Sequence, residues 1–70
     1  MITPQQRANH NTYLINEIEH IMKRLSKSES NRIKLLLDAC FIIDDDLKYT
    51  KALKRTYLTA CQAVDDANMD

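Results

Sequence analysis

Glycine is absent from the 70 residues of this chain, and Pro4 is its single proline. Without glycine there is no glycine-rich phosphate loop, dinucleotide-binding turn or nucleophile elbow, because these motifs need backbone geometry that glycine adopts at low cost. Two-residue hairpin turns with positive φ are disfavoured for the same reason. A chain with so few helix breakers is predicted to be all-α.

An excess of one charge and long apolar runs are also missing. Ten basic and ten acidic side chains give a formal net charge of zero, whereas a dedicated nucleic-acid packager is strongly basic. No run approaches the roughly 20 apolar residues that span a membrane, and no signal peptide is evident. We therefore expect no membrane association and a cytoplasmic location, with Cys40 and Cys61 reduced.

The first helical signal begins at Thr3, which can act as an N-cap. Pro4 then takes the first helical position and Gln6 the capping-box position. Apolar residues recur at helical spacing farther on, and they predict a helix over residues 4–25. The serine-rich stretch 26–30 ends it, and Ser28 or Ser30 is expected to cap the next helix.

The second helix is predicted over residues 29–43. Its stretch Leu35–Ile43 is apolar around most of a helical wheel, which is wider than one ordinary buried stripe. We expect this helix to be the central element, covered from at least two directions, with Leu36 and Phe41 near the centre of the core.

The third helix is predicted over residues 47–67. Its apolar face is rotated away from that of the second helix, and a break at Asp44–Asp46 reconciles the two faces. The result is a single domain, residues 1–70, folded as a small three-helix bundle. The alternative is a two-helix hairpin with one long second helix. Apolar surface left over on the second helix is expected to meet a second copy of the chain, forming a dimer, or another protein.

No group of side chains indicates catalysis, a cofactor or a metal. The two histidines and two cysteines lack the spacing of a zinc site. Asp44–Asp46 lack the spacing and the glycine of a calcium loop, and they are better explained as helix caps. Because no nucleophile is paired with an oriented base, we expect a protein that is not an enzyme.

The third helix carries a basic face, and the polar start of the first helix carries a second group of exposed side chains. Tyrosine adds apolar area with a polar tip, which suits it to contacts between proteins. The candidate partner-binding residues are Lys48, Tyr49, Lys51 and Arg55 on the third helix, and Arg7, His10 and Tyr13 on the first.

These features predict a small regulatory or protein-binding protein, such as an adaptor, inhibitor or accessory factor, that masks a partner protein's surface. The alternative is a dimeric DNA-binding transcriptional regulator that inserts helix 47–67 into the major groove. The three aspartates at the start of that helix would repel DNA phosphates, which favours a protein over nucleic acid as the partner.

Overall fold

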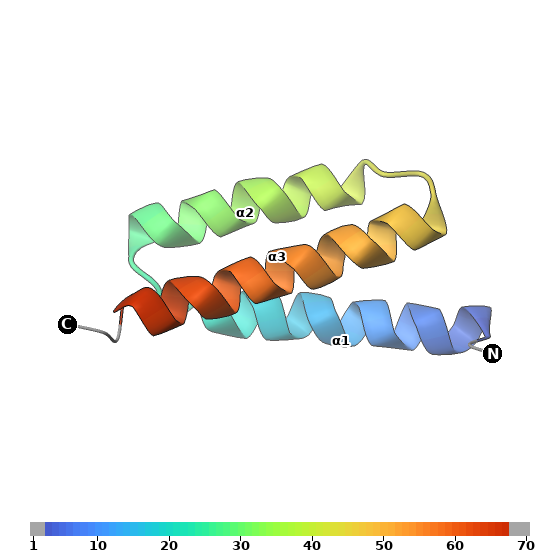
Figure 1. Ribbon diagram of the computed structural model, residues 1–70, viewed down its shortest axis with the longest axis horizontal. Coiled ribbons are helices and arrows are strands. Elements are labelled where there is room, and N and C mark those ends of the chain that lie inside the picture. Colours follow the sequence, from blue (N-terminus) through green and yellow to red (C-terminus); the bar gives the residue numbers. More distant parts are fainter. Residues whose placement is uncertain (1–2, 68–70) are drawn as a thin grey trace.

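The computed structural model describes residues 3–67, and within them the chain forms three helices and no strand (Figure 1). The helices are α1 (Pro4–Met22), α2 (Lys27–Phe41) and α3 (Asp46–Ala67). The predicted all-α three-helix bundle is confirmed. The two-helix hairpin is excluded, because residues 43–45 are not helical and separate α2 from α3.

The capping box predicted at the start of α1 is present. The Thr3 hydroxyl oxygen accepts from the backbone N–H of Gln6 at 3.1 Å, and the Gln6 side-chain oxygen accepts from the Thr3 N–H at 3.0 Å. α1 ends at Met22, three residues before the predicted end. At this end the N–H groups of Arg24 and Leu25 donate to the carbonyls three residues back, those of Ile21 and Met22. The α-helical pattern, in which each N–H bonds four residues back, therefore stops there.

The start of α2 differs from the prediction. Ser26 is the N-cap, and its hydroxyl oxygen accepts from the Glu29 N–H at 3.3 Å. Ser28 and Ser30, the predicted caps, lie inside the helix instead. The serines offer the same capping chemistry, and the one that precedes the earliest helical residue takes the role. α2 therefore begins at Lys27 and ends at Phe41.

α3 begins at the aspartates, one residue before the predicted start. The Asp45 carboxylate accepts from the Lys48 N–H at 2.9 Å, and the Asp45 carbonyl accepts from the Tyr49 N–H at 2.8 Å. Asp45 thus caps α3, as expected for the acidic cluster. None of the residues described here has a positive φ, so both connections between helices form without glycine.

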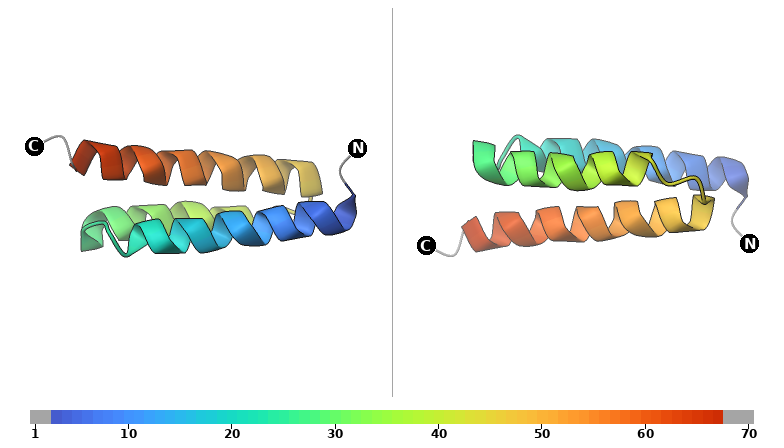
Figure 2. Two further views of the ribbon diagram at one scale, coloured as in Figure 1. Left: turned by 90° about the horizontal axis from the view of Figure 1, so that it is seen from below. Right: turned by 90° about the horizontal axis from the view of Figure 1, so that it is seen from above.

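The central helix is α3, not α2 as predicted. α3 packs along both other helices, whereas α1 and α2 touch little. Figure 2 shows α1 and α2 in one layer and α3 in a second layer. α1 and α3 run in the same direction, and α2 runs opposite to them (Figure 1). This arrangement leaves α2 covered from one side only.

The core is a narrow strip of side chains at the meeting line of the three helices. On α2 the buried positions are Ile33, Leu37 and Cys40, which form a single helical stripe. Leu36 and Phe41, predicted at the centre, are 39% and 51% exposed because they flank the buried stripe on opposite sides and no further helix covers either flank. The core consists of Leu14, Ile18, Ile33, Leu37, Cys40, Leu53 and Ala60.

One hydrogen bond between side chains joins α2 to α3 inside the core. The Thr56 hydroxyl donates its single hydrogen to the Ala52 carbonyl at 2.9 Å. Its oxygen lies 3.3 Å from the Cys40 sulfur and so accepts from the thiol. Thr56 is 4% exposed, and this pairing satisfies a polar group that would otherwise be costly to bury.

The central position of α3 predicts that Leu53 contributes more to stability than any exposed leucine. Leu53→Ala should lower the free energy of unfolding by about 3 kcal/mol, because it leaves a cavity at a fully buried site. The matched control is Leu58→Ala in the same helix, where the side chain is 58% exposed and the expected loss is under about 0.5 kcal/mol. Urea unfolding followed by circular dichroism measures both. Equal losses would contradict a central α3.

The cap of α2 predicts a second difference between matched variants. Ser26→Ala should lower the free energy of unfolding by about 1 kcal/mol, because the Glu29 N–H loses its acceptor. Ser28→Ala removes the same hydroxyl from an exposed position inside the helix and should change stability by less than about 0.5 kcal/mol. Thermal melts of the two variants and the parent protein measure this difference in stability. A larger loss for Ser28→Ala would place the cap elsewhere.

Candidate functional site

The line along which α2 meets α3 is hollowed in two places, and Arg55 borders both hollows. The first hollow, here called the basic groove, lies beside the second half of α2 and the first half of α3, and it has a volume of about 340 Å³. It exists because the two helices meet there through small side chains that do not fill the valley between them. The basic groove is lined by Leu36, Ala39, Cys40, Ile43, Lys48, Lys51, Ala52, Arg55 and Thr56.

The two edges of the basic groove differ in chemistry. The edge formed by α2 and the residues after it is apolar, with Leu36 and Ile43. The α3 edge carries Lys48, Lys51 and Arg55, all exposed. No acidic side chain lines the groove, although acids and bases balance over the whole chain. The basic groove is therefore a local concentration of positive charge beside an apolar surface.

Large apolar side chains are exposed on the elements that build the groove. Leu35 is 70% exposed on α2, Ile42 is 81% exposed at its C-cap, and Leu47 is 57% exposed in the first turn of α3. Water contact with such side chains is unfavourable, and the exposure of several of them on a small protein is typical of a binding protein.

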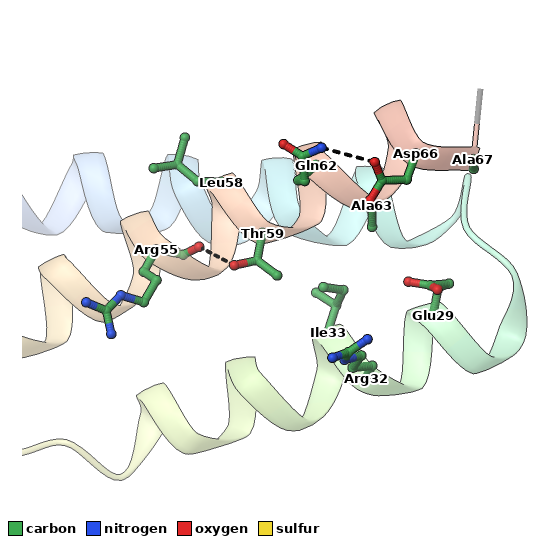
Figure 3. A pocket seen from close by; sticks show the side chains of 10 residues that line it. All are labelled: Glu29, Arg32, Ile33, Arg55, Leu58, Thr59, Gln62, Ala63, Asp66 and Ala67. Atoms are coloured by element: carbon green, nitrogen blue, oxygen red, sulfur yellow. Dashed lines mark hydrogen bonds between the residues drawn. The ribbon is translucent and has the colours of Figure 1, made fainter. Parts of the chain in front are cut away.

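The second hollow, here called the terminal hollow, lies between the first half of α2 and the second half of α3 (Figure 3). Its volume is about 570 Å³. Two acids, Glu29 and Asp66, and two bases, Arg32 and Arg55, line it, so their charges balance. The Gln62 amide that Figure 3 shows at its edge already donates to the Asp66 carboxylate at 3.1 Å. The terminal hollow is larger but has no charge of its own to select a ligand.

Three of the predicted contact residues, Lys48, Lys51 and Arg55, come together in the basic groove. Tyr49, predicted beside them, is half-buried against the core, with its ring edge-to-face with Phe41 and the ring centres 6.5 Å apart. Burial, and to a lesser degree the nearby Cys40 thiol, raises the pKa of Tyr49 above its usual value. Tyr49 thus belongs to the packing between α2 and α3 and does not line the groove.

The predicted residues on α1 lie apart from the groove. His10 and Tyr13 are exposed and Arg7 is half-buried, and none of the three lines either hollow. The first turns of α1 extend past the start of α3 (Figure 1). Farther along, the Thr50 hydroxyl donates to the Asn11 side-chain oxygen at 3.1 Å and ties α3 to α1. Arg7, His10 and Tyr13 therefore belong to a separate surface.

Sequence reasoning missed the apolar residues of the groove, Leu36, Ala39, Ile43 and Ala52. Leu36, Ala39 and Ile43 lie in the apolar stretch Leu35–Ile43, which the sequence predicts to be covered by other helices. The available signal was the width of the apolar arc on α2, since an arc wider than one stripe must leave part of itself exposed when only one helix covers it.

Residues 3–67 contain no metal-binding cluster of histidine, cysteine, aspartate or glutamate side chains. In the same range, no helix combines the length and apolar character required to cross a membrane. No family model, curated protein or solved structure matches this chain. The geometry of the two hollows is therefore the basis for assigning a function.

The floor of the basic groove predicts a specific cost for removing the Thr56 hydroxyl. Thr56→Val keeps the shape but leaves the buried Cys40 thiol without its acceptor, so the free energy of unfolding should fall by about 1 kcal/mol. Thr59→Val is the control, because the Thr59 hydroxyl also donates to the carbonyl four residues back but lies exposed. Urea unfolding compares them. Equal changes would mean that the thiol contact adds nothing.

Proposed function

We propose that this protein is a small non-enzymatic binding protein that covers the surface of a partner protein. It would do so with its α2–α3 face, which consists of the basic groove and the exposed side chains of Leu35, Leu36 and Ile42. The observation that carries this proposal is the basic groove together with the exposed apolar side chains of α2 around it. Adaptors, inhibitors and accessory factors all act by such masking, and a regulatory role follows if the covered surface is one the partner needs.

The exposed apolar area supplies the driving force for binding. About 25 cal/mol is gained for each Å² of apolar surface removed from water. Covering Leu35, Leu36 and Ile42 with a partner therefore lowers the free energy of the complex. Interfaces commonly have such a buried apolar centre with charged residues at the rim. Lys48, Lys51 and Arg55 have the rim position here.

The α1 residues Arg7, His10 and Tyr13 are proposed as a second contact area for the same partner or another one. Tyr13 is 55% exposed and is the large apolar anchor of that group. We also propose a cytoplasmic location, where the free thiols of Cys40 and Cys61 stay reduced. A second copy of the chain is the other protein partner that the exposed face of α2 suits, and it would make the protein a homodimer.

The second candidate function is a dimeric DNA-binding regulator that uses α3. The observation in its favour is the exposed row of Lys48, Lys51 and Arg55. Two features disfavour it. The row borders an apolar groove against α2 instead of standing clear of the bundle, and Asp44–Asp46 are exposed at the N-terminal end of α3, where they repel phosphates.

A pull-down with the tagged full chain tests the proposal, with and without nuclease, at moderate salt. We expect one stoichiometric protein that survives nuclease and is lost with Ile42→Asp, which places a charge on the exposed apolar face. Asn16→Asp, at an exposed position of α1, is the control and should retain the partner. Sedimentation of the purified chain shows whether a second copy occupies the face.

Recovery of nucleic acid, with bound proteins lost on nuclease treatment, would favour the DNA-binding candidate instead. Steep weakening as salt rises would accompany it, because neutralising several phosphates releases counterions. A partner retained equally by Ile42→Asp and Asn16→Asp would contradict the use of the α2–α3 face.

A further inference from the structure

We propose that the occupant of the basic groove is an amphipathic helix of the partner protein with acidic side chains along one flank. This inference rests on the proposed function and names the chemistry of the partner. The apolar lining of the groove and the row of positive charge on one edge support it.

The lining of the groove suits the apolar stripe of a helix. The buried Cys40 and Thr56 form the floor of the groove. The groove above them is lined by the apolar side chains of Leu36, Ala39, Ile43 and Ala52. A helix laid in such a valley inserts side chains spaced three and four residues apart, which is the usual way a groove binds a helix. The contact removes apolar area of both partners from water.

The charged edge selects the flank of that helix. Lys48, Lys51 and Arg55 are spaced by three and four residues along α3, so they form one row about 10 Å long. A bound helix aligned with α3 meets this row with positions spaced in the same way. Acidic side chains there are attracted, and basic ones are repelled. Because the opposite edge is apolar, the acids are needed on one flank only, and this asymmetry orients the helix.

Other occupants fit less well. Nucleic acid needs positive charge but makes no use of the apolar side chains that line the groove. A second copy that pairs its groove with this one offers the row of basic side chains no acidic partner, because no acidic side chain lines the groove. An acidic amphipathic helix has an apolar stripe that matches the apolar lining of the groove and carboxylates that match Lys48, Lys51 and Arg55.

Selection from a phage-displayed library tests this without assuming a sequence. The library presents random peptides of about 16 residues, which is about four helical turns, to the full-length chain. Clones are then sorted by loss of binding to Ala39→Gln, in which a larger, helix-compatible side chain extends from an exposed lining position over the groove. We expect the groove-dependent clones to carry apolar residues at helical spacing with aspartate or glutamate on one flank.

Charge reversal on the row supplies the second measurement. Lys51→Glu should weaken a selected peptide, synthesised with a fluorescent label, by about tenfold in anisotropy titrations. Lys54→Glu makes the same change at an exposed position of α3 that does not line the groove, and it should have little effect. A labelled DNA duplex is titrated in parallel, and we expect it to bind more weakly than the peptide at physiological salt.

The outcomes separate the two proposals. Groove-dependent clones that are neutral or basic, or equal effects of Lys51→Glu and Lys54→Glu, would overturn the acidic helix while leaving the α2–α3 face as a protein-binding site. If no clone depends on Ala39, the acidic helix is overturned, and the pull-down with Ile42→Asp decides separately whether the α2–α3 face binds a partner. Tighter binding of DNA than of any peptide, lost with Lys51→Glu, would overturn both in favour of nucleic acid.

Discussion

The packing of α3 against both other helices is the contact on which the rest of the structure depends. α1 and α2 touch little, so neither would stay in place without α3 between them. Leu53 and Ala60, both fully buried, lie in this contact. The small size of Ala60 lets the helices approach closely, and Leu53 supplies the volume that holds them together. A chain this short buries only a small core, so these contacts make up a large share of it.

The same packing explains why a neutral chain presents a positively charged site. α3 turns its buried stripe toward the core and leaves Lys48, Lys51 and Arg55 along its border with α2. The balancing acids lie outside the groove, among them Asp44–Asp46 at the start of α3 and Asp65 and Asp66 in its last turns. Net charge therefore says little about binding when folding separates the charges into different regions.

Local chemistry made much of the fold predictable. The lack of glycine indicated the all-α class, and the capping box at Thr3 indicated the start of α1. The aspartates at the start of α3 indicated the break between α2 and α3. The residues whose roles were predicted wrongly depend on competition between equivalent caps or on tertiary contacts. Ser26 and Ser28 have equal capping chemistry, so the sequence does not choose between them. Leu36 looks like a core residue on a helical wheel, and only the placement of α3 leaves it exposed.

For the candidate site, the basic row was predictable from its spacing, and the groove beside it was not. A row of exposed side chains follows from the period of one helix. A groove also requires knowledge of which helix lies alongside and of which small residues meet. Ala39 and Ala52 give no sign in the sequence that they face each other across a hollow.

The exposure of Leu35 and Ile42 has a consequence for how this protein can change over evolutionary time. Folding places almost no demand on either side chain, since both lie largely in water. Drift should replace them with polar residues in any lineage where the α2–α3 face has lost its use. Persistence of large apolar residues there, alongside free variation at other exposed sites, would be the mark of selection by a partner instead of by stability.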